Sequence, residues 1–205
     1  AARGENFARL AQPVNQEFLF AGEACYDWEF AAYHLSYHRS ENKAHIPLMR
    51  YMLPDAPLMT AVTGFHDRHM INQCLLYRYI ISYEPYNFKG HLDDFPLTVA
   101  YGRQMDALRT ALRDYFWDGE FRDQVGASAT AEGKPHHPYS VFLNRKNGRA
   151  GVVVANYDER KSVTVQVTLD DGSHLHRYRL VDDPAWRPAE DGIVLPPASA
   201  AVVID

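Results

Sequence analysis

The stretch Glu17–Asp27, EFLFAGEACYD, decides how we interpret the fold. Within it, Phe18–Ala21 is a short apolar run, Gly22 allows the backbone to turn, and Glu23 follows directly. A continuous apolar run of this length is typical of a strand buried on both faces of a parallel sheet. A carboxylate at the end of such a strand lies where α/β sheets and barrels bind their ligands. Glu23 is therefore a candidate catalytic group, and the alternative is that it begins a loop or caps a helix.

The sequence after this stretch alternates between helical and extended patterns. Helical spacing of apolar residues predicts a helix over 27–41, and the apolar run 46–53 predicts a second buried strand. A helix is expected over 60–79, a third strand over 80–84, and a long helix over 96–116 that begins at a proline. Strands that alternate with helices indicate parallel βαβ units.

The chain divides into two parts with a linker between them. Three strand–helix units cannot close a barrel, so we predict that residues 1–119 are the last units of a (β/α)8 barrel. Residues 120–138 are rich in Gly, Pro and small side chains and are predicted to be a linker. Residues 139–205 contain only strand patterns, with hairpin signals at Asn147-Gly148 and Asp171-Gly172. The fold class is thus α/β plus all-β, with a small antiparallel β-sandwich at the end.

Two glutamates form the leading catalytic pair. Glu23 and Glu84 each follow a predicted strand, so parallel strands would bring both carboxylates to one edge of the sheet. Two carboxylates on either side of a glycosidic bond perform glycoside hydrolysis, one as the acid and the other as the nucleophile or base. The sequence leaves open which glutamate has which role, and also whether either one instead binds an arginine or a backbone donor.

Further residues near the predicted strand ends are candidates for substrate binding. Asp55 and Asp67 are secondary carboxylates, and Arg50 requires a partner if it is buried, for which Glu23 or Glu84 would serve. Asp27 is a further secondary carboxylate, and the remaining candidates are Tyr26, Tyr86 and Phe88, whose aromatic rings could stack on sugars.

Composition narrows the classes of partner. The net charge is −5 and the basic residues are scattered, which argues against a nucleic-acid partner. No apolar run reaches the roughly 18 residues of a membrane span. The histidine pairs lack a third ligand at motif spacing and no glycine-rich phosphate motif occurs, so we predict neither a metal nor a cofactor.

The order of these segments resembles the C-terminal part of a bacterial TIM-barrel glycoside hydrolase that carries a C-terminal β-sandwich, as α-galactosidase and α-amylase relatives do. The segments that carry the resemblance are FLFAGEACYD, IPLMRYMLPD, YIISYEP, LRDYFWDGEF and VVVANYD. The resemblance implies an O-glycosyl hydrolase, a carbohydrate substrate, and an N-terminal barrel segment missing from this chain. A non-catalytic carbohydrate-binding or structural domain remains the alternative.

Overall fold

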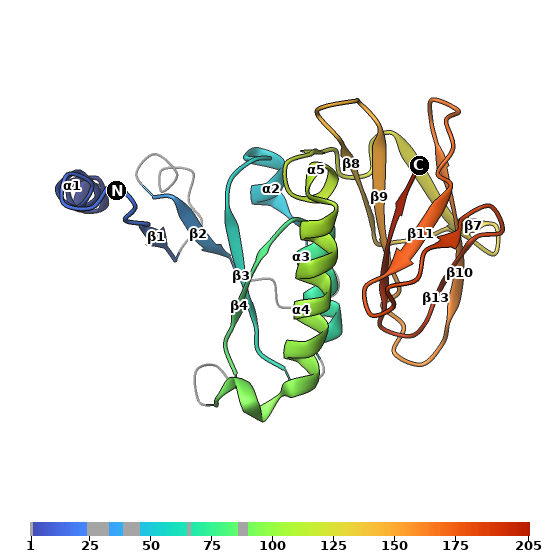
Figure 1. Cartoon of the computed structure of the whole chain (residues 1–205), viewed down its shortest axis with the longest axis horizontal. Coiled ribbons are helices and arrows are strands. Elements are labelled where there is room, and N and C mark those ends of the chain that lie inside the picture. Colours follow the sequence, from blue (N-terminus) through green and yellow to red (C-terminus); the bar gives the residue numbers. More distant parts are fainter. Residues whose placement is uncertain (1, 24–32, 39–45, 65–66, 86–89) are drawn as a thin grey trace.

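The computed structural model describes residues 2–23, 33–38, 46–64, 67–85 and 90–205, which fold into a helix-covered parallel sheet followed by an antiparallel sandwich (Figure 1). The first part contains α1 (Ala2–Ala11), β1 (Ala21–Gly22), β2 (Leu35–His38), α2 (Leu48–Met52), β3 (Leu58–Val62), α3 (Arg68–Leu76), β4 (Ile80–Tyr83), η2 (Leu92–Asp94), α4 (Pro96–Ala111) and α5 (Arg113–Phe116). The second part contains β5 (Glu120–Phe121), β6 (Ala127–Ala131), β7 (Lys134–Pro135), β8 (Tyr139–Leu143), β9 (Ala150–Ala155), β10 (Val163–Leu169), β11 (Arg177–Leu180), β12 (Arg187–Pro188), β13 (Ile193–Leu195) and β14 (Ala200–Ile204).

The first sheet has the strand order β1-β2-β3-β4, and every neighbouring pair is parallel. In β3, Leu58, Thr60 and Val62 are buried and alternate with partly exposed residues, as expected for a strand with one well-covered face. The parallel direction predicted for the segments that end at Glu23 and Glu84 is therefore confirmed. The described residues show four strands of an open sheet, and closure into a barrel stays a prediction.

Two predicted elements near the start of the chain are wrong. Part of the predicted helix 27–41 is the strand β2, and the predicted strand 46–53 contains the helix α2. Short apolar runs fit both periods, and Pro47 directly before α2 favours a first helical turn. The predicted helix 60–79 is also wrong in its first part, where β3 occupies 58–62 and α3 begins only at Arg68.

The helices α3 and α4 lie between the parallel sheet and the sandwich (Figure 1). All residues of α3 from Met70 to Leu76 are buried, which is typical of a helix covered on every side. One side of α3 packs against the parallel sheet and α4, and the other side packs against β9. A single apolar core, which includes Leu58, Leu75, Phe116 and Val153, therefore joins the two parts of the chain.

The sandwich consists of two antiparallel sheets with the orders β13-β10-β6-β7 and β12-β11-β14-β9-β8-β5. Val152 and Val154 of β9 belong to the core between these sheets, whereas Val153 belongs to the core shared with α3. Both faces of β9 are thus covered, which explains its unbroken apolar sequence. Gly148 and Gly172 have φ angles of 71° and 75°, values that glycine adopts without strain. The predicted hairpin at Asn147-Gly148 is confirmed, because β8 pairs with β9, whereas the one at Asp171-Gly172 is wrong, because β10 and β11 belong to different sheets.

The stretch 120–138, which we predicted to be a linker, contains three strands. β5 pairs with β8, β6 pairs with β10, and β7 pairs with β6. These strands complete the edges of both sandwich sheets, so the sandwich begins at about Glu120 rather than at Tyr139.

None of the helices in the described ranges is both long enough and apolar enough to cross a lipid bilayer.

We expect Phe116→Ala to destabilise the fold strongly. Phe116 is fully buried, and its ring lies edge-on to the ring of Phe142 with 5.5 Å between the two ring centres. The substitution therefore leaves a cavity where α5 meets the sandwich. The expected loss is about 3–5 kcal/mol in the free energy of unfolding, measured by urea denaturation. Val125→Ala, at a side chain that is 63% exposed, serves as the control and should change the free energy of unfolding by less than about 0.5 kcal/mol. Equal effects of the two substitutions would contradict the shared core.

Candidate functional site

The carboxyl edge of the parallel sheet carries three acidic residues. Glu23 follows β1 and Glu84 follows β4, while Asp67 lies five residues after the end of β3. Because all four strands run in the same direction, their carboxyl ends lie at one edge. Glu23 is exposed, whereas Glu84 is buried and only 5% accessible. Glu23 is therefore the more accessible member of the predicted pair.

Glu84 is held by hydroxyl groups from two strands. The hydroxyl of Tyr37 on β2 donates to one carboxylate oxygen at 2.8 Å, and the hydroxyl of Ser82 on β4 donates to the other at 2.9 Å. The backbone N–H of Glu84 donates to the carbonyl of Val62 at the end of β3. These contacts connect β2, β3 and β4 through one residue, which fixes the Glu84 carboxylate in one orientation. Sequence reasoning missed Tyr37 and Ser82 as its partners.

Asp67 is fixed at the end of β3 by backbone donors. Its Oδ2 accepts hydrogen bonds from the N–H groups of Thr63 at 3.1 Å and Gly64 at 2.9 Å. The hydroxyl of Thr98 on α4 accepts from the N–H of Asp67 and donates to the carbonyl of Gly64. His69 Nδ1 lies 3.7 Å from the other carboxylate oxygen of Asp67. Asp67, only a secondary candidate from sequence, is thus also fixed within the fold.

Four predicted binding residues lie outside the described ranges. Tyr26 and Asp27 follow β1 in the sequence, and Tyr86 and Phe88 follow β4. Their predicted roles in substrate binding therefore stay predictions.

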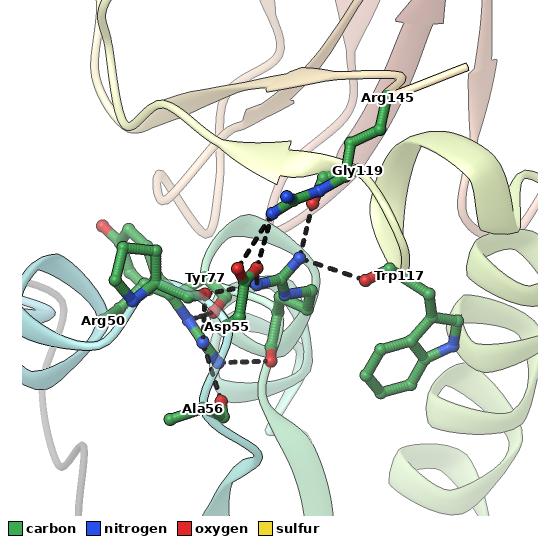
Figure 2. Close-up of polar contacts among 9 residues, drawn as sticks. Arg50, Asp55, Ala56, Tyr77, Trp117, Gly119 and Arg145 are labelled. Atoms are coloured by element: carbon green, nitrogen blue, oxygen red, sulfur yellow. Dashed lines mark hydrogen bonds and ion pairs between the residues drawn. The ribbon is translucent and has the colours of Figure 1, made fainter.

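Arg50 and Asp55 belong to the opposite edge of the sheet, which contradicts our prediction for both. Arg50 lies on the helix α2, is 1% exposed, and donates to the backbone carbonyls of Tyr77, Pro54, Ala56 and Arg78 (Figure 2). Tyr77 and Arg78 precede β4, so this guanidinium lies at the end where β4 begins, remote from Glu84. Asp55 precedes β3 and lies at the same edge.

Arg78 connects this edge to the start of the sandwich. Its guanidinium donates to the carbonyls of Trp117 and Gly119 at 3.0 and 2.6 Å, and also to Pro54. Asp55 accepts from Arg78 at 3.2 Å and from Arg145 of the β8–β9 loop at 2.7 and 3.0 Å (Figure 2). Sequence reasoning missed Arg78, although an arginine inside the apolar run 75–81 indicates a buried cation that needs acceptors.

The guanidinium groups at this junction are bound by one shared carboxylate, Asp55, and by backbone carbonyls. Partial burial works against ionisation of Asp55, but the hydrogen bond from Arg78 and the charge of Arg145 together hold the pKa of its carboxyl below the usual value. A hollow of about 490 Å³ at the junction is lined by Arg50, Arg78, Arg145 and other residues. Its cations are engaged by carbonyls and carboxylates, so we assign it a structural role.

Within the described ranges, no group of three or more His, Cys, Asp or Glu residues is arranged to hold a metal ion. Cys74 is a buried free thiol in α3, where burial raises its pKa to about 12. It therefore stays protonated at neutral pH and fills the core as a small apolar side chain.

Comparison with solved structures relates the fold to a glycosidase. The chain is similar to a noncanonic maltogenic alpha-amylase from Thermotoga neapolitana, with a TM-score of 0.51 and 12% sequence identity. The similarity covers 97% of this chain and 56% of that structure, so the chain spans little more than half of its length. At this identity the match shows a likeness of fold alone and does not extend to activity. No family model matches the sequence. No curated protein matches it either.

We expect Arg78→Met to destabilise the protein far more than Arg145→Met. Removal of the Arg78 guanidinium, which is 6% exposed, leaves carbonyls at the junction without their donors, at an expected cost of about 2–4 kcal/mol. Arg145 is 49% exposed and its partner Asp55 is 66% exposed, so its loss should cost less than about 1 kcal/mol. Urea denaturation of both variants measures the difference, and similar losses would contradict the role assigned to Arg78.

The contribution of Asp55 should depend on pH. Its pKa is lower in the folded state than in the unfolded state, so its stabilising effect is present above the unfolded pKa of about 3.8 and is lost as the pH falls through the folded value. We expect Asp55→Asn to cost less than about 1 kcal/mol at pH 7, because the side chain is mostly exposed, and a smaller amount well below pH 3.8, where more of the carboxyl is protonated. Denaturation at both pH values tests this, and a constant difference would refute it.

Proposed function

We propose that the carboxyl edge of the parallel sheet is part of the active site of an O-glycoside hydrolase. The observation that carries this proposal is that Glu23, Asp67 and Glu84 follow three strands of one sheet whose strands are all parallel. Carboxylates gathered at the exit edge of such strands are the groups that glycoside hydrolysis requires. The likeness of the fold to a maltogenic alpha-amylase supports an α-linked glucan as the substrate class.

The strand spacing supports different roles for the three acids. Neighbouring strands lie about 4.8 Å apart, so the ends of β1 and β4 are separated by about 14 Å along a flat sheet. The two carboxyls of a glycosidase are about 5–10 Å apart, so this pair fits only if the sheet curves or the side chains converge. The ends of β1 and β3 are separated by only about 10 Å. We therefore propose Glu23 as the group that exchanges a proton with the glycosidic oxygen. Asp67, whose side chain is 10% exposed and whose Oδ2 accepts from two backbone N–H groups, would act as its companion through the other carboxylate oxygen.

Glu84 has a positioning role in this proposal. Both of its carboxylate oxygens accept hydroxyl hydrogen bonds, and only 5% of the residue is accessible, which leaves little surface for a sugar. It instead fixes the ends of β2, β3 and β4 relative to one another. The sequence ranked Glu84 behind Glu23 as a catalytic candidate, and in this proposal Glu84 has no catalytic role.

A non-catalytic carbohydrate-binding protein is the second candidate. The burial of Glu84 favours it, because one of the two acids first predicted to perform the chemistry is engaged within the fold. In that case sugars would bind at the same edge and the carboxylates would not turn them over.

We expect Glu23→Gln to lower the hydrolysis of maltooligosaccharides by at least about 100-fold, because a general acid typically contributes a factor of 10² to 10⁴. The experiment uses the protein that contains this chain and measures reducing sugar released from maltohexaose, with binding followed by calorimetry. Glu17→Gln, at an exposed glutamate before β1, is the matched control and should leave turnover unchanged.

Undiminished turnover by the Glu23 variant would remove this residue from the catalytic set. Binding of maltohexaose without hydrolysis by the unaltered protein would favour the second candidate instead.

A further inference from the structure

One hydroxyl group binds the loop between β3 and α3 to the first turn of α4. Thr98 Oγ1 accepts a hydrogen bond from the N–H of Asp67 at 3.1 Å and donates to the carbonyl of Gly64 at 2.9 Å. Thr98 is 1% exposed and lies on α4, which packs against α3. The hydroxyl therefore holds the backbone of Asp67 against the buried part of the molecule.

Gly64 leaves room for the carboxylate of Asp67. A Cβ atom at Gly64 would lie 3.2 Å from Oδ2 and 3.3 Å from Cγ of Asp67, an approach that few Cβ atoms in proteins make. The φ angle of Gly64 lies outside the left-handed region, so the backbone itself does not require glycine there. The close approach of the carboxylate is what a side chain at this position would disturb.

These contacts determine which oxygen of Asp67 is turned toward a ligand. Oδ2 accepts from the N–H groups of Thr63 and Gly64 at 3.1 and 2.9 Å. The hydroxyl of Thr98 fixes the two backbone positions, at Gly64 and Asp67, between which this interaction is made. Oδ1, which lies 3.7 Å from His69 Nδ1, is thus the oxygen that faces a substrate.

We propose that Thr98 and Gly64 are positioning residues that fix the Asp67 carboxylate so that Oδ1 meets the sugar. This inference rests on the catalytic role proposed for Asp67. Thr98 contributes one acceptor and one donor, and Gly64 contributes space. A catalytic group displaced by about 1 Å can lose a factor of about 100 in rate, so small changes here should lower kcat. Thr98 is buried and does not reach a bound sugar, so KM should change little.

Steady-state hydrolysis of maltohexaose by the protein that contains this chain tests the proposal. Thr98→Val removes the hydroxyl at nearly constant volume, and we expect kcat to fall about 10- to 100-fold while KM stays within about twofold. Thr98→Ser keeps the hydroxyl and should recover most of the lost kcat. Thr110→Val, at an exposed threonine of the same helix, is the matched control and should leave both constants unchanged.

A double-mutant cycle separates positioning from a general loss of structure. In a protein that already carries Asp67→Asn, Thr98→Val should lower kcat by less than about twofold, because the carboxylate that the hydroxyl positions is no longer present. Gly64→Ala should lower kcat about tenfold by itself and should also have little further effect in the Asp67→Asn protein.

Amide hydrogen exchange shows directly whether the hydroxyl fixes the loop. The N–H of Asp67 donates to Thr98, so Thr98→Val should make this amide exchange at least about tenfold faster, whereas Thr98→Ser should not. Amides of β14, which lie in the sandwich, serve as the internal reference in both variants.

Three results would each overturn the proposal. These are an unchanged kcat in the Thr98→Val protein, a full effect of Thr98→Val in the Asp67→Asn background, and equal exchange of the Asp67 amide in the valine and serine variants. If Glu23→Gln abolishes hydrolysis and Thr98→Val does not lower it, this inference fails while the proposed function stands. Absence of hydrolysis by the unaltered protein would instead overturn both.

Discussion

The structure depends on buried guanidinium groups that bind backbone carbonyls where β3 and β4 begin. Arg50 and Arg78 are almost fully buried, and Arg109 of α4 donates to the carbonyls of Cys74 and Tyr79 while its guanidinium lies 3.7 Å from the ring centre of Trp117. Carbonyls at the ends of helices and strands lack partners within their own elements, and a planar cation with five donors can satisfy several of them at once. Desolvation of these cations is costly, and the carbonyls that accept from their N–H groups offset part of that cost.

The two edges of the parallel sheet therefore have different tasks. The edge where the strands begin holds α2, the α5–β5 connection and the β8–β9 loop together through arginine contacts. The edge where the strands end carries the acidic residues and the segments that follow them. Contacts that stabilise one edge need not constrain the chemistry of the other, which is a common arrangement in α/β proteins.

Regular elements with strong local signals could be predicted from the sequence, and elements defined by distant partners could not. β4 and α4 have a bounded apolar run and a long helical period, and both were predicted within a few residues. β6 has the sequence ASATA, which lacks the large side chains typical of strands, and it is a strand because β10 pairs with it.

The same distinction applies to the candidate site. The common direction of the strands was predicted from their alternation with helices, and the shared edge of Glu23 and Glu84 followed from it, although the elements predicted over 27–41 and 46–53 were wrong. The hydroxyl of Tyr37 reaches Glu84 only because β2 and β4 lie on either side of β3, and no local pattern specifies that register. Arg50 was correctly expected to need a partner, but its acceptors were assigned to the wrong edge because its segment was taken for a strand.

The burial of α3 on both sides has a consequence for how this protein can evolve. Its inward side chains fit the parallel sheet and its outward side chains fit β9, so one helix has to satisfy two different surfaces. An exchange of the sandwich by genetic recombination would leave the outward side mismatched unless α3 changed at the same time. We therefore expect the sandwich to be inherited together with the helix beneath it, rather than to be shuffled as a separate module.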